Sequence, residues 1–434
     1  MNTNNIFLDQ AFYIKWFKNN ILVDWSYPLF YVDYISLLFI LLSSILIILC
    51  IIISWNIVNK LEKEFFFLIL LIQLFLTIIF SSMDLLIFYI FFELILIPIF
   101  LIIIIWGSRI ERFKSAYYFF IYTLFGSLFM LLSIFFIYSE IGSTSWFHLS
   151  FIKLTSSKLI FISICLSMAI KIPMFPFHIW LPQAHVEAPI SGSILLAGIL
   201  LKLGGYGLIR FGLPLFFDEA NFFKSFFIIM SFIAIIYGSL LTIRQIDAKR
   251  LIAYSSISHM GFVTLGIFSL TNEGLTASII LMLAHGFISS ALFILVTCLY
   301  ERFHTRIIRY FKGLLCVMPI FCSFFLFVTI ANISFPFTLN FWGELIILKS
   351  IVTYFNFFFY FFIIISIVFT SIYSFNFYNK ICWGIFNPNI FYSRDINKNE
   401  FISLFFLIIL TFLLGLYPIL LLNNINLNIC LLLF

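Results

Sequence analysis

Charge is scarce in this sequence. Only 10% of the 434 residues are Asp, Glu, Lys or Arg, whereas an ordinary soluble domain carries roughly a quarter. Hydrophobic residues make up 64% of the chain, which excludes a water-soluble globule. The net charge of +6 is small and its basic residues are dispersed, so no nucleic-acid partner is expected. The cysteines show no C-x-x-C spacing, and no zinc or iron–sulfur site is expected.

Apolar stretches of membrane-spanning length recur along the chain, and a helix needs about 20 such residues to cross a bilayer. The sequence therefore predicts an all-α polytopic membrane protein. A polar N-terminal segment outside the membrane (1–32) precedes the membrane domain (33–422), and a C-terminal tail (423–434) follows it. About 12 transmembrane helices are expected, at 33–55, 65–82, 84–106, 116–138, 158–178, 188–211, 222–243, 250–270, 275–300, 314–352, 354–379 and 401–422.

The basic residues are unevenly divided between the two sides of the membrane. When alternate loops are placed on opposite sides, most Lys and Arg gather on one side, including Lys249 and Arg306. Arg210 falls among the few cations on the other side. We interpret these loop cations as charges that fix orientation, which places both termini on the electropositive outer side.

Two spans are interrupted by proline where the bilayer interior should be. The interruptions are 171–182 and 332–344, and both contain Phe-Pro-Phe, at 175–177 and 335–337. They fall in the fifth and tenth spans, which run in opposite directions. This arrangement indicates two inverted five-helix repeats, each with a broken helix, as in transporters. Proline kinks used only for packing are the alternative.

Ionisable residues also lie inside the spans, where an unpaired charge costs roughly 3 kcal/mol. Their series has the composition of a proton relay. Lys171 is the natural ion-pair partner of Glu93, and Lys202 is a candidate site that takes up and releases the transferred proton. The alternative for each histidine is a hydrogen bond to a backbone carbonyl with no further role. The alternative for the buried lysines and glutamates is a purely structural role. Glycines near Lys202 are interpreted as helix-packing positions. The relay candidates are Glu93, Lys171, Lys202, His259 and Glu344, followed by His285, His178 and His185.

The segments Lys171-Ile-Pro-Met-Phe-Pro-Phe-His-Ile-Trp-Leu-Pro-Gln-Ala-His-Val-Glu-Ala-Pro189 and Ser193-Ile-Leu-Leu-Ala-Gly-Ile-Leu-Leu-Lys-Leu-Gly-Gly-Tyr-Gly207 closely resemble the subunit 4 family of respiratory complex I, the proton-pumping NADH:ubiquinone oxidoreductase. Further matching motifs follow the family's order, at 89–93, 247–261, 299–306, 340–344 and 414–418. The resemblance covers about residues 30–420.

This resemblance implies an antiporter-like, proton-pumping module related to Mrp antiporters, in the mitochondrial inner membrane and encoded in the organelle. It implies a non-redox subunit with no chemical active site of its own, because NADH, FMN, iron–sulfur clusters and ubiquinone are bound by other subunits. The matching motifs imply that Glu93 pairs with Lys171 of the first broken helix and that Lys202 is the lysine at the centre of the relay. They also imply that His259 is a histidine connecting the two halves of the relay, and that Glu344 is the acid on the exit side, in the second broken helix. The acid at 344 favours subunit 4 over the sister subunits 2 and 5, which are expected partners together with membrane lipids.

One departure from the family is that its members begin with two further helices, so 12 spans stand where 14 are expected. A separate polypeptide is expected to fill that gap. Besides an inert membrane scaffold that keeps the fold but has lost transport, two alternatives with an activity of their own remain open for function. One is a free-standing Mrp-type cation/proton antiporter subunit, and the other is a haem-binding membrane electron carrier with His259 and His285 as axial ligands.

Overall fold

The computed structural model describes residues 29–55, 57–151, 157–352, 357–385 and 394–433, and the extended elements within these ranges are helices. The prediction of an all-helical polytopic membrane protein is confirmed. Within the described ranges, nine helices are long and apolar enough to cross a membrane: Tyr34–Ser54, Glu62–Ser81, Leu85–Trp106, Arg112–Ile141, Ile190–Leu215, Phe217–Arg244, Ala248–Phe268, Asn272–Phe303 and Lys398–Leu416.

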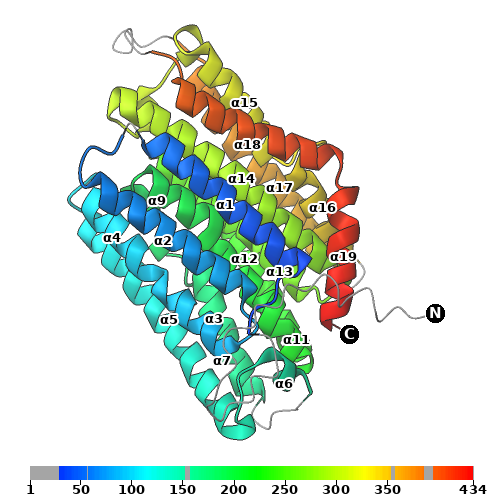
Figure 1. The fold of residues 1–434 in the computed structure, drawn as a ribbon. Helices are drawn as coiled ribbons and strands as arrows, with labels where there is room; N and C mark the ends of the chain where they lie inside the picture. The colour runs from blue at the N-terminus through cyan, green and yellow to red at the C-terminus, as the bar shows by residue number, and fades with distance from the viewer. Residues whose placement is uncertain (1–28, 56, 152–156, 353–356, 386–393, 434) are drawn as a thin grey trace.

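The N-terminal half is an array of long helices lying side by side (Figure 1). Its third span begins where the Asp84 carboxylate accepts a hydrogen bond from the amide of Leu86 at 2.8 Å, a cap that satisfies a free donor. The same span is divided close to Glu93, since Pro98 cannot donate to the carbonyl four residues earlier. The helices of this half are α1 (Tyr34–Ser54), α2 (Glu62–Ser81), α3 (Leu85–Leu94), α4 (Leu96–Trp106), α5 (Arg112–Ile141), α6 (Trp146–Phe151), α7 (Ser157–Lys171) and α8 (Trp180–Glu187).

The next span is irregular in its interior. Two π-helical turns, η1 (Leu196–Leu200) and η2 (Leu208–Gly212), flank the short helix that carries Lys202. A π turn widens the helix and shifts carbonyls out of the normal pattern, and such turns are frequent at functional sites. The regular parts of this span are α9 (Ile190–Leu195), α10 (Leu201–Gly207) and α11 (Leu213–Leu215).

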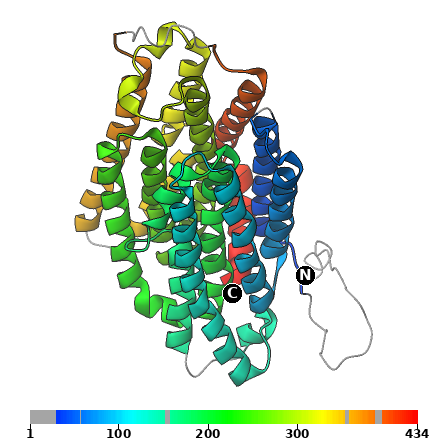
Figure 2. The same cartoon turned by 90° about the vertical axis from the view of Figure 1, so that its left-hand side faces the viewer.

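The C-terminal half completes the bundle, and most long helices run along one common direction (Figure 2). The prediction places the last span at 401–422, but the helix ends at Leu416 before Pro418, and a further helix follows. The tail residues 423–433 therefore continue a helix, α19, that packs against α14. The helices of this half are α12 (Phe217–Arg244), α13 (Ala248–Phe268), α14 (Asn272–Phe303), η3 (Ile308–Tyr310), η4 (Leu314–Cys316), α15 (Pro319–Asn332), α16 (Leu339–Val352), α17 (Phe357–Cys382), α18 (Lys398–Leu416) and α19 (Ile419–Leu433).

Both predicted helix breaks are present. The first separates α7 from α8, and the second separates α15 from α16. In the first break the amides of Met174 and Phe177 donate to Ala169 and Met174, and in the second the amides of Phe335 and Thr338 donate to Ile330 and Phe335. Corresponding donors lie 161 positions apart (335 minus 174, 338 minus 177). The two breaks therefore share one pattern of backbone hydrogen bonds.

A side chain crosses each break in the same way. Trp180 Nε1 donates to the carbonyl of Ile170 at 3.0 Å, and Asn340 Nδ2 donates to the carbonyl of Ala331 at 3.2 Å. Each acceptor is the residue before the last residue of its helix. These bonds occupy carbonyls that the interrupted helix leaves without an amide partner.

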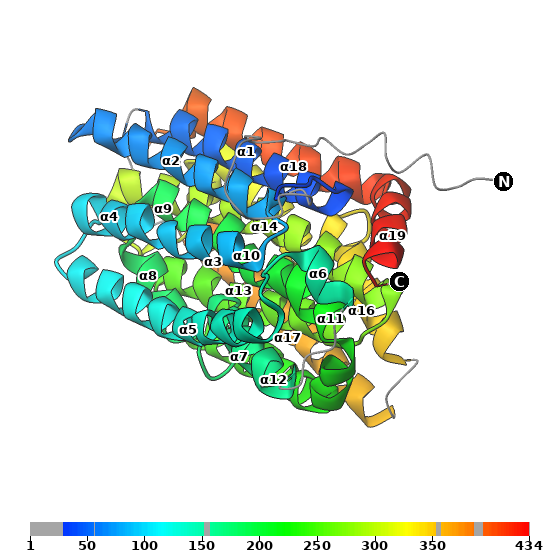
Figure 3. The same ribbon diagram turned by 60° about the horizontal axis from the view of Figure 1, so that its bottom comes forward.

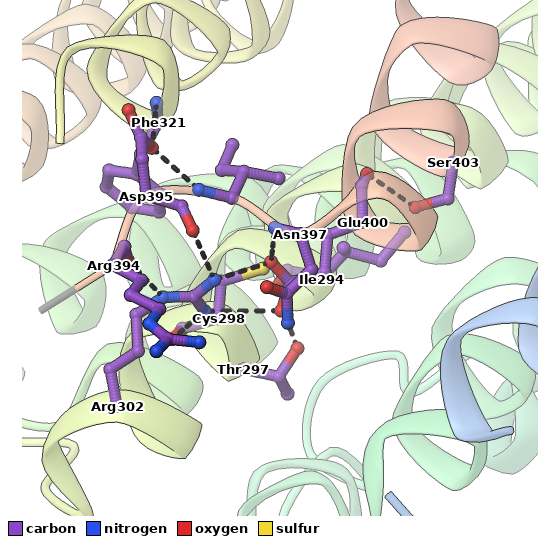
Figure 4. A network of polar contacts seen from close by, with 11 residues as sticks. Ile294, Thr297, Cys298, Arg302, Phe321, Arg394, Asp395, Asn397, Glu400 and Ser403 are labelled. Atoms are coloured by element: carbon purple, nitrogen blue, oxygen red, sulfur yellow. Dashed lines mark hydrogen bonds and ion pairs between the residues drawn. The ribbon is translucent and has the colours of Figure 1, made fainter. Parts of the chain in front are cut away.

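The ends of α14, α15 and α18 are tied together by a polar network (Figure 4). Arg302 makes a bidentate pair with Glu400 at 2.7 and 3.2 Å and also donates to the carbonyls of Arg394 and Asp395. The carboxylate of Asp395 accepts from the amides of Ile320 and Phe321 in the first turn of α15. A bidentate arginine pair with few exposed atoms has a fixed geometry, so this network holds three helix ends in one place.

Helix α1 joins the two halves of the molecule. It lies beside α2 on one side and near α14 and α18 on the other (Figures 1 and 3). The apolar stretches of α14 and of the α9–α11 span, and nearly all of that of α13, are buried on every side. A helix that is surrounded by protein cannot serve as a lipid-facing wall, so these three spans form the interior in which the polar residues lie.

Candidate functional site

Lys202 and His285 form the centre of the site. Both side chains are buried, and Lys202 Nζ lies 2.8 Å from His285 Nδ1. The same ammonium donates to the carbonyl of Ala197, five residues earlier in the widened turn η1. An ammonium group only donates hydrogen bonds, so with a charged Lys202 the Nδ1 of His285 is the acceptor. The contact is therefore geometrically suited to exchange of one proton between the two groups.

Close helix packing makes this contact possible. Gly198 and Gly286 face each other, and a Cβ on Gly286 would lie 3.3 Å from the carbonyl oxygen of Gly198. A Cβ on Gly205 would lie 2.5 Å from Met282 Sδ of α14. Small residues let helix backbones approach one another, which agrees with our interpretation of these glycines as packing positions.

His259 and Glu344 extend the arrangement into the C-terminal half. The rings of His285 and His259 have centroids 5.7 Å apart. His259 Nδ1 lies 3.4 Å from Glu344 Oε1, an ion-pair distance without the geometry of a hydrogen bond. We call Lys202, His285, His259 and Glu344 the central axis. Its members come from α10, α14, α13 and α16, so four different helices place them in one row.

Two residues that the sequence analysis missed contact this axis. Asn332 Oδ1 lies 3.2 Å from His259 Nε2, and the hydroxyl of Tyr373 lies 3.4 Å from the same nitrogen. Asn332 ends α15 just as Lys171 ends α7, and this position at a helix break is a signal that could have identified it. Tyr373 lies within an aromatic helix of no distinctive pattern, and no sequence signal indicated it.

Glu93 and Lys171 do not form the direct ion pair that the sequence predicts. Lys171 Nζ donates instead to the carbonyl of Phe92 at 2.7 Å and lies 3.1 Å from the centroid of the Phe92 ring. Glu93 Oε1 is buried without a hydrogen-bond partner, although its charge lies within electrostatic reach of Lys171. The break beside Glu93 explains this arrangement, because it frees a carbonyl at the end of α3 to accept the ammonium.

His185 lies between the central axis and a second group of buried cations. Its ring stacks on Phe293 with centroids 4.8 Å apart, and neither ring nitrogen has a hydrogen-bond partner among the described residues. The ring is within electrostatic reach of both Lys249 and Lys202. His178, in contrast, contacts Phe175 and Tyr237 at the first helix break and makes no described contact with the central axis.

Three cations that the sequence places among orientation-setting loop charges are in fact buried. Lys249 Nζ donates to the carbonyl of Ala188 at 2.9 Å, and Arg306 donates to the carbonyl of Val186. Arg210 is ion-paired with Asp33. These three are therefore not solvated loop charges: carbonyls at the end of α8 accept from Lys249 and Arg306, and an acid pairs with Arg210. Their part in setting orientation stays a prediction.

The haem alternative does not fit this geometry. Both ring nitrogens of His259 already face protein groups, Glu344 and Asn332, and Nδ1 of His285 contacts Lys202. An axial ligand has to present a free ring nitrogen to the iron, so His259 and His285 do not have the arrangement of a haem-ligand pair.

Together these features define an antiporter-like class of membrane protein, with broken helices beside a buried row of ionisable groups. The family model described as NADH:quinone oxidoreductase/Mrp antiporter, TM, matches residues 82–370, and the chain belongs to this family.

Among curated relatives, the chain is 50% identical to NADH-ubiquinone oxidoreductase chain 4 of Metridium senile, covering 92% of this chain and 82% of that protein. It is 48% identical to chain 4 of Chondrus crispus, covering 91% and 81%. Among solved structures, it is similar to a chain of respiratory complex I from Thermus thermophilus with bound NADH, with a TM-score of 0.85, 28% identity and coverage of 93% and 86%. The Mrp complex from a Dietzia species has the same fold, with a TM-score of 0.82, 18% identity and coverage of 93% and 84%.

Proposed function

We propose that this chain is a proton-translocating, antiporter-like subunit in the membrane arm of a respiratory complex I. Electron transfer from NADH to ubiquinone takes place in other subunits, and this chain carries protons without a redox centre of its own. The run of contacts from Lys202 through His285 and His259 to Glu344 supports this most directly. Family membership and the chain 4 relatives agree with it.

In this mechanism Lys202 holds the central proton. It passes the proton to Nδ1 of His285, which accepts there and releases a different proton from Nε2, as imidazole can. His259 accepts next and passes a proton from Nδ1 to the carboxylate of Glu344. Lys202 is then neutral and is reloaded from the side of Lys171 and Glu93, or through His185, whose ring is within electrostatic reach of it. His178, which contacts Phe175 and Tyr237 at the first break, has the position of a gate.

The same proposal includes the architecture of two inverted five-helix repeats within about 12 membrane spans. Equal hydrogen-bond patterns in the two breaks support it, together with the matching positions of Lys171 and Asn332 at the ends of α7 and α15. The residues that match by backbone hydrogen bonds are offset by one position from those that match by the Phe-Pro-Phe motif. The Phe-Pro-Phe motifs lie 160 positions apart (335 minus 175), whereas the backbone bonds lie 161 apart (335 minus 174).

The expected partners are other membrane-arm subunits, including the sister subunits 2 and 5, in the mitochondrial inner membrane. The face formed by α1 and α2 lies where the family has two further helices. It exposes apolar side chains such as Leu41 and Ile48 on α1, and Phe67 and Leu74 on α2, which supports a cover on this face. We propose that another polypeptide or ordered lipid covers it. A free-standing Mrp-type antiporter would share the relay, and copurification of this chain with redox subunits distinguishes the two.

Substitution of Lys202 tests the function. Arginine keeps the positive charge but does not give up its proton in proteins, so Lys202→Arg should preserve assembly and block transfer. Lys202→Met should also block it. The measurement is the ratio of protons pumped to electrons transferred in sealed vesicles that contain the intact complex.

The matched control is Lys349→Arg, since Lys349 is exposed and paired with Glu273 at 2.6 Å, outside the central axis. It should leave the ratio unchanged. A normal ratio in an assembled Lys202→Arg complex would show that Lys202 supplies only a fixed charge, and the proposed loading role would be abandoned.

A further inference from the structure

A cavity of about 540 Å³ lies at the ends of α12 and α17, outside the central axis. Four basic side chains line it: Arg244 at the end of α12, Arg309 in η3, Lys312 in the following loop and Lys380 near the end of α17. All four are exposed. Their convergence is not required for setting orientation, since that depends on how many charges lie on one side and not on whether they share a cavity.

Within the part of the chain that the structure describes, no acidic side chain lines this cavity. Asp247, close by in the chain, is ion-paired with Arg250 at 3.6 Å. Among the described residues, none of the four cations has an acidic partner. The cavity therefore carries four positive charges without compensation, and such a site attracts an anion with more than one negative charge.

The remaining lining is apolar and lies where helices leave the membrane. Trp383, Ile385 and Ile246 are exposed, and Ile243 and Ile308 complete the apolar lining. Tryptophan is enriched at the membrane–water interface, and helices α12 and α17, whose ends line the cavity, pack against each other. A free inorganic ion would use the cations alone, whereas a lipid would use both the cations and the apolar rim.

The backbone around the cavity is held in place. The amide of Ile308 donates to the carbonyl of Ile246 at 3.0 Å, and the amide of Gly313 donates to the carbonyl of Trp383 at 3.3 Å. Gly384 has a φ of +110° and approaches Lys312 closely enough that a Cβ would lie 3.9 Å from Lys312 Cβ. The first bond holds the turn that carries Arg309 against the connection between α12 and α13, and the second holds the loop that carries Lys312 against the end of α17.

We propose that this cavity binds the headgroup of an anionic phospholipid, and that a headgroup with two phosphates satisfies its four cations best. Basic pockets between membrane helices suit such headgroups when they lie on the side of the membrane where most loop Lys and Arg gather. The volume is within the range of about 300–1,000 Å³ that small-ligand sites occupy. This site is independent of proton transfer through the central axis.

The test uses the intact complex, solubilised, depleted of lipid and then mixed with vesicles of phosphatidylcholine containing diphosphatidylglycerol. Arg244→Gln with Lys380→Gln should weaken retention of diphosphatidylglycerol at this site by about thirtyfold. That factor corresponds to about 2 kcal/mol, since each basic residue at an anionic surface contributes on the order of 1 kcal/mol. Native mass spectrometry counts the bound lipid. If the double variant assembles poorly, Arg309→Gln with Lys312→Gln makes the same test.

The matched control is Lys60→Gln with Lys63→Gln, two exposed cations before and within the first turn of α2. This pair should retain the lipid as the unaltered complex does. An equal loss in the control, or no loss in the cavity variant, overturns the proposal. Competition by inorganic phosphate at the same concentration of phosphorus would identify a soluble-anion site instead, and crosslinking of the cavity to an acidic segment of a neighbouring subunit would identify a protein contact.

Discussion

Gly204 controls the separation of two helices that carry relay candidates, α7 ending at Lys171 and α10 carrying Lys202. A Cβ on Gly204 would lie 2.5 Å from Ile172 Cγ1 and 2.9 Å from the carbonyl oxygen of Met168. Ordinary contact begins at 3.4 Å. The Ile172 side chain can rotate away, but the carbonyl belongs to the backbone, so Gly204→Ala has to separate the helices by about 0.5 Å (3.4 minus 2.9).

Overpacking of this kind typically costs about 1–3 kcal/mol. We expect Gly204→Ala to lower the thermal stability of this chain in the assembled complex. It should also lower the ratio of protons to electrons, because the separation of Lys171 from Lys202 increases while every charge stays in place. Thermal unfolding of the intact complex and pumping in sealed vesicles measure the two effects.

Gly212→Ala is the matched control, since its Cβ would meet Leu208 Cδ2 at an ordinary 3.4 Å. It should change neither quantity. Equal behaviour of the two variants would refute the packing argument. Loss of stability in Gly204→Ala with an unchanged proton ratio would show that this spacing has no part in proton transfer.

Two further predictions concern buried charges. Arg210→Met should destabilise the chain by about 3–5 kcal/mol because it leaves Asp33 buried without its partner; adding Asp33→Leu should recover most of this loss in a thermal unfolding assay, and a double variant as unstable as the single one would contradict the reasoning. Glu93→Gln should assemble normally, because Lys171 keeps its bond to the Phe92 carbonyl, yet lower the proton ratio in sealed vesicles; a normal ratio would remove Glu93 from the relay.

The sequence alone identified the residues of the central axis, because an ionisable side chain inside an apolar stretch is visible without any fold. Their contacts could not be predicted in the same way. Lys202 and His285 lie 83 positions apart, and only the packing of the α9–α11 span on α14, through glycines, brings them together. The expected Glu93–Lys171 pair failed for a local reason, since the end of α3 offers the lysine a backbone acceptor.

Loop position misled the sequence analysis for Lys249, Arg306 and Arg210. From sequence alone, a cation between two apolar stretches is expected to be exposed to solvent. Backbone carbonyls instead accept from Lys249 and Arg306, and Asp33 pairs with Arg210. The broken helices were predicted correctly, since proline, a repeated motif and a neighbouring charge coincide at both. Their shared hydrogen-bond pattern required coordinates.

The network around Arg302 has a mechanical consequence for the second broken helix. Asp395 holds the first turn of α15, and Arg302 and Glu400 join that turn to α14 and α18. The other end of α15 stops at Asn332, beside His259. With one end clamped, the pivot for any displacement of Glu344 lies in residues 333–338. The clamped half of the broken helix, and Asn332 with it, therefore keeps its place against His259 whatever the position of Glu344.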